Sequence, residues 1–316
     1  MNNKTKQVLV NQNIYGCKVG FYQNCPMGKS LKTSYVNNFN VGEQQSICNV
    51  YVVNQHALDT IEEFCGHSVQ PQLKDGWMNP VVMCVVDRNN FFGTNFNQSE
   101  GIIDDIFNVR TNLNMITHSG NPFPLREKEC VYNKSITVIR DINFQPLPLP
   151  QVYSMGLIVI SPINKPPLLD ENRMGSNEFL NMMTTIETMF QTAIYYGHNI
   201  LVLTPFGHTT DEIPQEDVIK IYNSLIFKYF HRFKYIIISV SPVDGQELFT
   251  LYDDNIIKPH ELCEEDLDEI INQNNNEENE NNNNDVNNDI DTDNTRIRIK
   301  NSNTYTTNTT NTTKNY

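Results

Sequence analysis

Residues 199–218 read NILVLTPFGHTTDEIPQEDV, a pattern typical of a strand followed by a helix. An apolar run typical of a buried strand ends at Pro205, a short polar segment follows, and a helical pattern starts at Pro214. Proline is favoured in the first turn of a helix, and acidic residues near it complement the helix dipole. In α/β proteins, ligands bind at such a junction because the carboxyl end of the strand and the amino end of the helix both face it.

The same alternation of strand and helix runs through most of the chain. Continuous apolar runs such as PVVMCVVD are typical of strands covered on both faces. Strands are expected at residues 50–53, 80–87, 136–141, 153–162, 200–206 and 234–241, and helices at 56–64, 102–116, 177–196 and from 214. Gly197 follows the third helix, where glycine commonly ends a helix. The pattern predicts an α/β fold: a three-layer α/β/α sandwich around a mixed, mostly parallel sheet.

Four segments of different character are expected along the chain. Residues 1–45 are polar and predict an irregular N-terminal segment, and residues 46–245 contain the α/β domain. Residues 246–272 predict a helical extension. Residues 273–316 are rich in Asn, Asp and Thr, and they contain too few apolar groups to offset the entropy lost on ordering, so a disordered tail is expected there.

Charge and cysteine content exclude several classes of protein. The formal net charge is −14, of which residues 264–316 contribute −8 through 12 acidic and 4 basic residues, leaving −6 for the rest. An acidic body has no broad surface for duplex nucleic acid. The seven cysteines form no C-x-x-C pair, which argues against a zinc knuckle or a disulfide framework, and Cys84 is expected to be a small buried apolar residue.

The expected location is cytoplasmic or nuclear, in a reducing compartment. No signal peptide is evident at the N-terminus, and no apolar run approaches the length that spans a membrane. The sequence leaves the oligomeric state open.

The segment CPMGKS, residues 25–30, ends like a phosphate-binding P-loop. A P-loop needs G-x-x-x-x-G-K-[ST] after a strand, whereas here Gln23 stands at the first glycine position and no apolar strand precedes it. We therefore reject a nucleotide site at this segment.

Two strand-to-helix junctions are candidate ligand sites. One contains Gly93, Thr94, Asn95 and Phe96, and the other contains Phe206, Gly207, His208, Thr209 and Thr210. Backbone N–H groups that turn toward one point can hold an anion such as a diphosphate. Each junction has a single glycine, so the alternative remains that both are ordinary connections.

Titratable residues at these junctions allow two interpretations. Asp104 and Asp105 open the helix after the first junction, where carboxylates commonly complement the helix dipole. One of them alternatively faces the loop as a general acid or base. His208 is either a phosphate donor or a polar surface residue.

The order of elements resembles the catalytic domain of microbial-type poly(ADP-ribose) glycohydrolases, which are macrodomain relatives. The resemblance rests on NKSITVIRD (133–141), MGLIVISPINKP (155–166) and the frame of residues 200–241, from ILVLTPFGHTT to HRFKYIIISVS. VYVVNQHALDTIEEF (50–64) is similar to the first strand and helix of that family. The resemblance covers roughly residues 48–242 and implies a macrodomain-like fold.

The resemblance also implies a ligand and a chemistry. ADP-ribose would lie across the strand ends, with its diphosphate and distal ribose against the residues of the two junctions. Asp105 would be the acid/base that protonates the departing ribose oxygen, Asp104 would be its neighbour, and water would attack the oxocarbenium-like centre. No metal and no cofactor is implied.

The chain departs from the family pattern at the residues that are expected to carry the chemistry. Two of three consecutive family glycines are replaced, by Thr94 and Asn95, and a Cβ there disfavours a positive φ and close backbone approach. The family's Gln-Glu-Glu falls on Ile103, Asp104 and Asp105, whose carboxylates are one methylene shorter, about 1.5 Å of reach. Three hypotheses stay open: an ADP-ribose glycohydrolase, an ADP-ribose or nucleotide-binding module that does not cleave, and a scaffold that keeps only the fold.

Overall fold

The structure is a computed structural model with one main sheet at its centre. It describes residues 3–22, 29–42, 48–65, 78–86, 88, 103–115, 117–118, 123–163, 165–170, 173–208 and 211–259. Residues Met1–Asp268 form one compact unit, and the second unit, Glu269–Tyr316, lies outside the described residues together with the expected tail.

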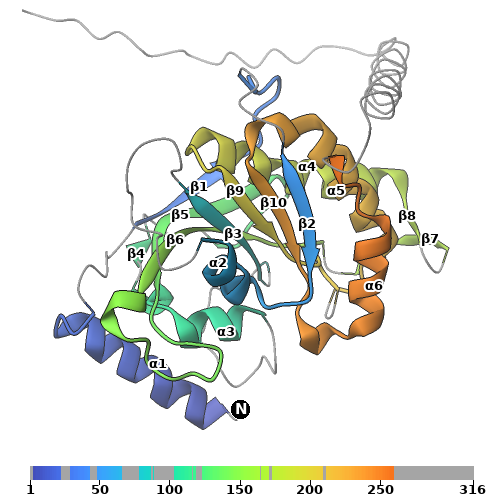
Figure 1. The fold of residues 1–316 in the computed structure, drawn as a ribbon. Helices are drawn as coiled ribbons and strands as arrows, with labels where there is room; N and C mark the ends of the chain where they lie inside the picture. The colour runs from blue at the N-terminus through green and yellow to red at the C-terminus, as the bar shows by residue number, and fades with distance from the viewer. Residues whose placement is uncertain are drawn as a thin grey trace, which may run out of the picture. The chain divides into compact units, whose positions relative to one another are not determined.

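An eight-stranded sheet carries the fold in the order β2-β10-β9-β3-β6-β5-β1-β4 (Figure 1). Its strands are β1 (Lys29–Ser34), β2 (Asn49–Val53), β3 (Pro80–Val85), β4 (Thr117–His118), β5 (Glu129–Val138), β6 (Tyr153–Ile160), β9 (Ile200–Leu203) and β10 (Tyr235–Ser239). β2, β10, β9, β3 and β6 are mutually parallel, whereas β5 runs antiparallel to β6 and β1. The predicted mixed, mostly parallel sheet is confirmed.

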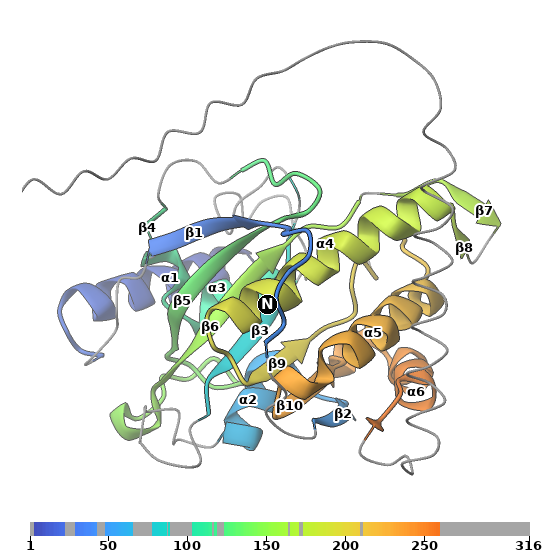
Figure 2. The same cartoon turned by 90° about the horizontal axis from the view of Figure 1, so that it is seen from above.

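Helices cover both faces of this sheet. The elements outside the sheet are α1 (Asn3–Lys18), α2 (Ala57–Cys65), α3 (Ile103–Arg110), α4 (Ser176–Tyr195), α5 (Gln215–Tyr229), α6 (Gln246–Asn255) and a hairpin of β7 (Leu168–Asp170) and β8 (Arg173–Met174). One core cluster joins α4, α5 and α6 to one face of the sheet, and a second joins α2 and α3 to the other. Figure 2 shows α4 and α5 lying along one side of the sheet, and α1 lies beside α3.

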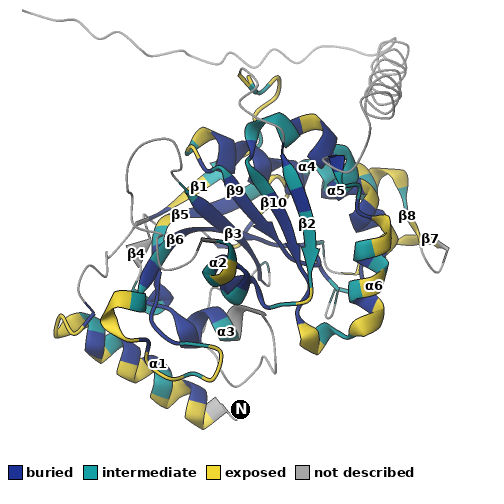
Figure 3. Cartoon of the chain, in the orientation of Figure 1, coloured by how far each residue is buried: buried dark blue, intermediate teal, exposed yellow. Residues whose placement is uncertain are grey.

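The two faces of the central strands are both buried, as Figure 3 shows. In β3, Val81 and Met83 belong to the cluster with α4, while Val82 and Cys84 belong to the cluster with α2 and α3. Successive side chains of a strand point to opposite faces, so a strand between two helical layers must be apolar throughout. The expected burial of Cys84 is confirmed, at 0% exposure.

The expectation of an irregular N-terminal segment is wrong for its described part. Residues Asn3–Lys18 form α1, and residues Lys29–Ser34 form β1, which pairs with β5. On α1 the side chains that turn inward include Lys6, Val10 and Asn13, which follow helical spacing but are mostly polar. Val10, with the partly buried Leu9 and Ile14, packs against Val109, so the apolar stripe that usually marks a packed helix is small here and interrupted by polar side chains.

Two further local expectations can be compared with the structure. Lys29 and Ser30 lie in a strand, whereas the residues that end a P-loop open a helix. The helix expected over residues 102–116 ends at Arg110, because the backbone N–H groups of Ile139 and Arg140 bond to the Arg110 carbonyl. A separate 3-10 turn follows at Leu113–Met115.

Among the described residues, no helix combines the length and apolar character that crossing a bilayer requires.

Candidate functional site

The connections after β3 and β9 leave the sheet at the same edge. The two strands are parallel neighbours, with Val81 opposite Leu201 and Val82 opposite Val202. Their carboxyl ends, at Val85 and Leu203, therefore point to the same edge of the sheet. The two junctions therefore start from the same edge of the sheet.

The connection after β9 is held by side chains from α5 and α6. The Tyr222 hydroxyl donates to the carbonyl of Thr204 at 2.7 Å. The Gln215 amide donates to the carbonyl of Phe206 at 3.2 Å, and the Tyr252 hydroxyl donates to the Gln215 amide oxygen at 2.7 Å. These partners fix the backbone where the turn leaves the strand.

Gly207 is required at its position in this turn. Its φ is +66°, in the left-handed region that side chains with a Cβ rarely adopt. A methyl group on its Cα would overlap Cδ1 of Ile213 and lie 2.9 Å from Cγ1. The Ile213 N–H also donates to the Gly207 carbonyl at 3.2 Å, so the chain folds back tightly over this residue.

His208 lies near the connection that follows β10. It is half-buried, and both interpretations considered above stay open. Burial raises the pKa of Asp244, which follows β10, and the nearby His208 partly offsets that rise. His208 and Asp244 are therefore electrostatic neighbours at the carboxyl edge. Thr209 and Thr210 lie outside the described residues.

The connection after β6 reaches the same turn. The Lys165 N–H donates to the carbonyl of Asp211 at 3.0 Å, and the Lys165 ammonium lies 2.6 Å from the Glu212 carboxylate. Both side chains of this pair are about 60% exposed, at 60% and 65%, so the pair adds little stability, but the backbone bond joins the two loops.

The expected residues of the first junction are only partly described. Gly93, Thr94, Asn95 and Phe96 lie outside the described residues. Asp104 and Asp105 are the second and third residues of α3, so they stand in its first turn. The structure describes their backbone, and their role stays a prediction.

Buried polar atoms without a partner among the described residues occur at the strand ends, where no sequence pattern predicted them. They are Oε1 of Gln55 and Nε2 of His56, after β2, and Oγ1 of Thr204, after β9. Buried polar atoms almost always have a hydrogen-bond partner, so such atoms are candidate contacts for a ligand or water.

The protonation state of His56 follows from its surroundings. Burial, together with the nearby charge of Arg110, lowers its pKa to about 3. Its Nδ1 accepts a hydrogen bond from the Leu58 N–H at 3.2 Å, so the neutral ring carries its proton on Nε2. His56 therefore presents a donor at the carboxyl edge.

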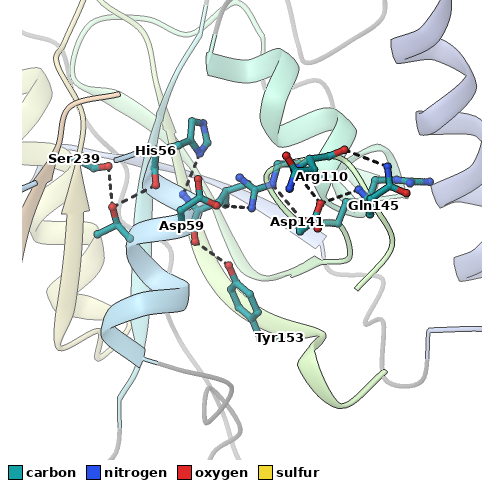
Figure 4. A network of polar contacts seen from close by, with 11 residues as sticks. His56, Asp59, Arg110, Asp141, Gln145, Tyr153 and Ser239 are labelled. Atoms are coloured by element: carbon teal, nitrogen blue, oxygen red, sulfur yellow. Dashed lines mark hydrogen bonds and ion pairs between the residues drawn. The ribbon is translucent and has the colours of Figure 1, made fainter. Parts of the chain in front are cut away.

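A buried polar network joins α2 to α3 beside this edge (Figure 4). The Asp59 carboxylate faces the Arg110 guanidinium, with 2.7 Å between Oδ1 and Nη2. Arg110 Nε also donates to the carbonyl of Arg140 at 3.1 Å. The Tyr153 hydroxyl donates to the Leu58 carbonyl at 2.9 Å, which fixes α2 against β6. The network holds the helix whose first turn carries Asp104 and Asp105.

No group of three or more His, Cys, Asp or Glu side chains that could hold a metal ion occurs among the residues that the structure describes. The groups at this edge are hydrogen-bond donors and acceptors, which suit an organic ligand with phosphate and hydroxyl groups.

Comparison with known proteins identifies the fold. No protein-family model matches the sequence, and no curated protein matches it significantly. The poly(ADP-ribose) glycohydrolase of Thermomonospora curvata is similar in structure, with a TM-score of 0.64, 11% identity, and coverage of 80% of this chain and 100% of that one. The same enzyme bound to the inhibitor ADP-HPD gives a TM-score of 0.59 at 11% identity, covering 79% and 98%.

A second organism gives the same result. The poly(ADP-ribose) glycohydrolase of Deinococcus radiodurans in complex with ADP-ribose has a TM-score of 0.52 and 11% identity, covering 65% of this chain and 84% of that one. An identity of 11% carries no information on function, whereas the agreement in topology is extensive. The described part of this chain has the macrodomain-like fold of the bacterial poly(ADP-ribose) glycohydrolases.

Proposed function

We propose that this chain binds ADP-ribose at the carboxyl edge of its parallel strands and hydrolyses the O-glycosidic linkages of poly(ADP-ribose). The observation that carries the proposal is the pairing of β3 with β9 on the fold of the bacterial glycohydrolases. Because the two strands are paired, the two candidate loops begin next to each other. The Deinococcus radiodurans structure, with the same fold, contains ADP-ribose.

In the proposed complex, the diphosphate contacts backbone N–H groups of the two junctions. At Gly207 the diphosphate can approach the backbone closely, because the left-handed conformation and missing side chain of this residue keep the turn tight. Gly93, Thr94, Asn95 and Phe96 contribute from the other junction, and Phe206, His208, Thr209 and Thr210 complete the second. The partly buried His208 adds a ring N–H that can donate to a phosphate.

The proposed chemistry uses the carboxylates at the start of α3. Asp105 protonates the departing ribose oxygen as the glycosidic bond breaks, and an oxocarbenium-like centre develops on the sugar. The resulting carboxylate then takes a proton from the attacking water, which restores the acid. Asp104 is the neighbouring carboxylate, one residue earlier on the helix.

A second candidate is a module that binds ADP-ribose without cleaving it. Thr94 and Asn95 stand where the family has glycines, and Asp105 is one methylene shorter than the family's glutamate. Misplacing a catalytic group by about 1 Å can lower a rate on the order of 100-fold. A chain that binds ADP-ribose but releases none from the polymer would support this candidate.

The test of hydrolysis is release of ADP-ribose from poly(ADP-ribose) by the wild-type chain, by Asp105→Ala and by the control Asp254→Ala. Asp254 is an exposed residue of α6, on the opposite face of the sheet from α3. We expect release by the wild type and the control and background release by Asp105→Ala. Equal, background-level release by all three would reject the enzymatic proposal.

A further inference from the structure

We propose that the N-terminal helix α1 positions the acidic end of α3, and that Asn13 is the positioning residue. The inference rests on the proposed function, because it assigns α1 a role in orienting the helix of Asp104 and Asp105. It concerns a helix whose small apolar contact is joined by buried polar side chains and that packs along α3 (Figures 1 and 2).

Asn13 holds the last turn of α3 through its carboxamide. Its Nδ2 donates to the carbonyl of Val109 at 2.7 Å and lies 3.4 Å from the carbonyl of Thr111. The last carbonyls of a helix have no partner within the helix and need one from elsewhere. Asn13 is 2% exposed and 96 residues away from Val109 in sequence, so this is a buried, long-range contact.

The oxygen of the same carboxamide is also hydrogen-bonded. Asn13 Oδ1 accepts a hydrogen bond from Arg140 Nε at 2.7 Å, and the neighbouring Gln12 Oε1 accepts one from Arg140 Nη2 at 3.0 Å. Arg140 Nη1 donates to the carbonyl of Phe144 at 2.8 Å. Among the described residues, two of the three acceptors of this buried guanidinium therefore come from α1, which makes docking of the helix specific in position.

α3 is short enough to transmit this constraint to its first turn. Its eight residues span about 12 Å, and Val109 lies about 7.5 Å along the axis from Asp104. Across the last turn, Asp59 holds Arg110 from α2 (Figure 4). A two-turn helix fixed from both sides at one end moves as a rigid body, so a shift at Asn13 displaces the carboxylate end as well.

The sharpest variant is Asn13→Asp in the full chain, because it preserves size and the acceptor for Arg140 but cannot donate to Val109. Asn11→Asp is the matched control: it makes the same charge change on the same helix, and Asn11 is exposed and accepts only from Gln7 among the bonds described for its side chain. Gln12→Ala is a milder variant that removes one bond from α1 to Arg140, and it serves if Asn13→Asp does not fold.

Two measurements separate positioning from general stability. We expect amide hydrogens of α3 to exchange at least tenfold faster in Asn13→Asp than in wild type, with α4 and α5 unchanged, and Asn11→Asp to match wild type. In ADP-ribose release, we expect kcat to fall about 10- to 100-fold while KM changes less than threefold, because orientation affects the chemical step.

The outcomes distinguish this inference from the proposed function. Unchanged α3 exchange in the variants overturns the role of Asn13 whether or not the wild-type chain is active. Faster exchange together with a wild-type kcat also overturns it. An inactive wild type whose α3 exchange responds to Asn13→Asp rejects hydrolysis while leaving the anchoring of α3 by α1 supported.

Discussion

Asp59 and Arg110 form an ion pair, with 2.7 Å between Oδ1 and Nη2, that joins the first turn of α2 to the last residue of α3. The Arg110 side chain is 2% exposed, so the pair is buried on its cationic side. A buried cation that loses its partner is costly, whereas a surface pair is worth little. The pair thus links the stability of the domain to the placement of α3.

Replacing Asp59 by Asn removes the charge and keeps the shape. We expect Asp59→Asn to lower the free energy of unfolding by about 3 kcal/mol, because it leaves Arg110 buried without a counter-charge. Urea titration measures this change. The control Glu212→Gln removes an exposed pair with Lys165 and should cost less than about 1 kcal/mol. Equal losses in both variants would contradict the structural role assigned to Arg110.

Gly207 allows a test that separates backbone strain from steric overlap. Gly207→Ala places a methyl group against Ile213 at a left-handed φ, and Gly197→Ala places one at a similar φ, +73°, with no atom within 4 Å. We expect Gly197→Ala to lower the free energy of unfolding by about 1 kcal/mol. Gly207→Ala should lower it clearly more, by about 2–4 kcal/mol. Equal losses of unfolding free energy in the two variants, measured by thermal or urea unfolding, would mean that the Ile213 side chain moves aside without a cost.

Two buried histidines make stability depend on pH. Burial lowers the pKa of His56 to about 3 and that of His198 to about 4, below the ordinary value of 6.5. Below pH 6.5 the unfolded chain binds protons that the folded chain excludes, so the free energy of unfolding falls as pH drops toward 4. At pH 5 each histidine should contribute a loss of about 2 kcal/mol relative to pH 7.5.

His198→Gln isolates one of these contributions. In the native chain, His198 Nε2 lies 2.9 Å from the Tyr132 hydroxyl, and Nδ1 lies 3.1 Å from the carbonyl of Asn79. Urea titrations of wild type and variant at pH 7.5 and pH 5 should show a pH-dependent loss smaller by about 2 kcal/mol in His198→Gln. An identical pH dependence in both chains would show that His198 titrates normally when folded.

The central strands could be predicted from sequence because their burial leaves a local pattern. β3 is buried at every residue, and β9 likewise, so each appears as an uninterrupted apolar run. Gly207 could also be singled out, since glycine in a strand-to-helix turn has a local conformational cause.

Other features have no local cause and could not be predicted. α1 docks through Asn13 and Gln12, whose partner Arg140 is 127 and 128 residues away, and polar contacts of that kind leave no periodic apolar signal. β1 lies near the edge of the sheet and is polar except for Leu31, so its sequence resembles a loop. The buried atoms of Gln55, His56 and Thr204 depend on which strand ends meet, which only the topology decides.

The shortened carboxylate gives a gain-of-function prediction. Asp105→Glu restores about 1.5 Å of reach at the proposed acid, and ADP-ribose release from the polymer should rise, by up to about 100-fold if reach limits the rate. Asp104→Glu is the control, because it makes the same change one residue earlier on α3 and should give the smaller gain. If the rate falls in Asp105→Glu and not in Asp104→Glu, the inference that the Asp105 carboxylate lies too far from the glycosidic bond is contradicted.

The most direct measurement is a calorimetric titration of the full chain with ADP-ribose, run beside Gly207→Ala. We expect saturable one-site binding to the wild type and an affinity at least tenfold weaker, about 1.4 kcal/mol, in the variant, because the turn after β9 forms part of the site. No binding to the folded wild type, or equal affinity in both chains, would contradict a ligand site built on that turn.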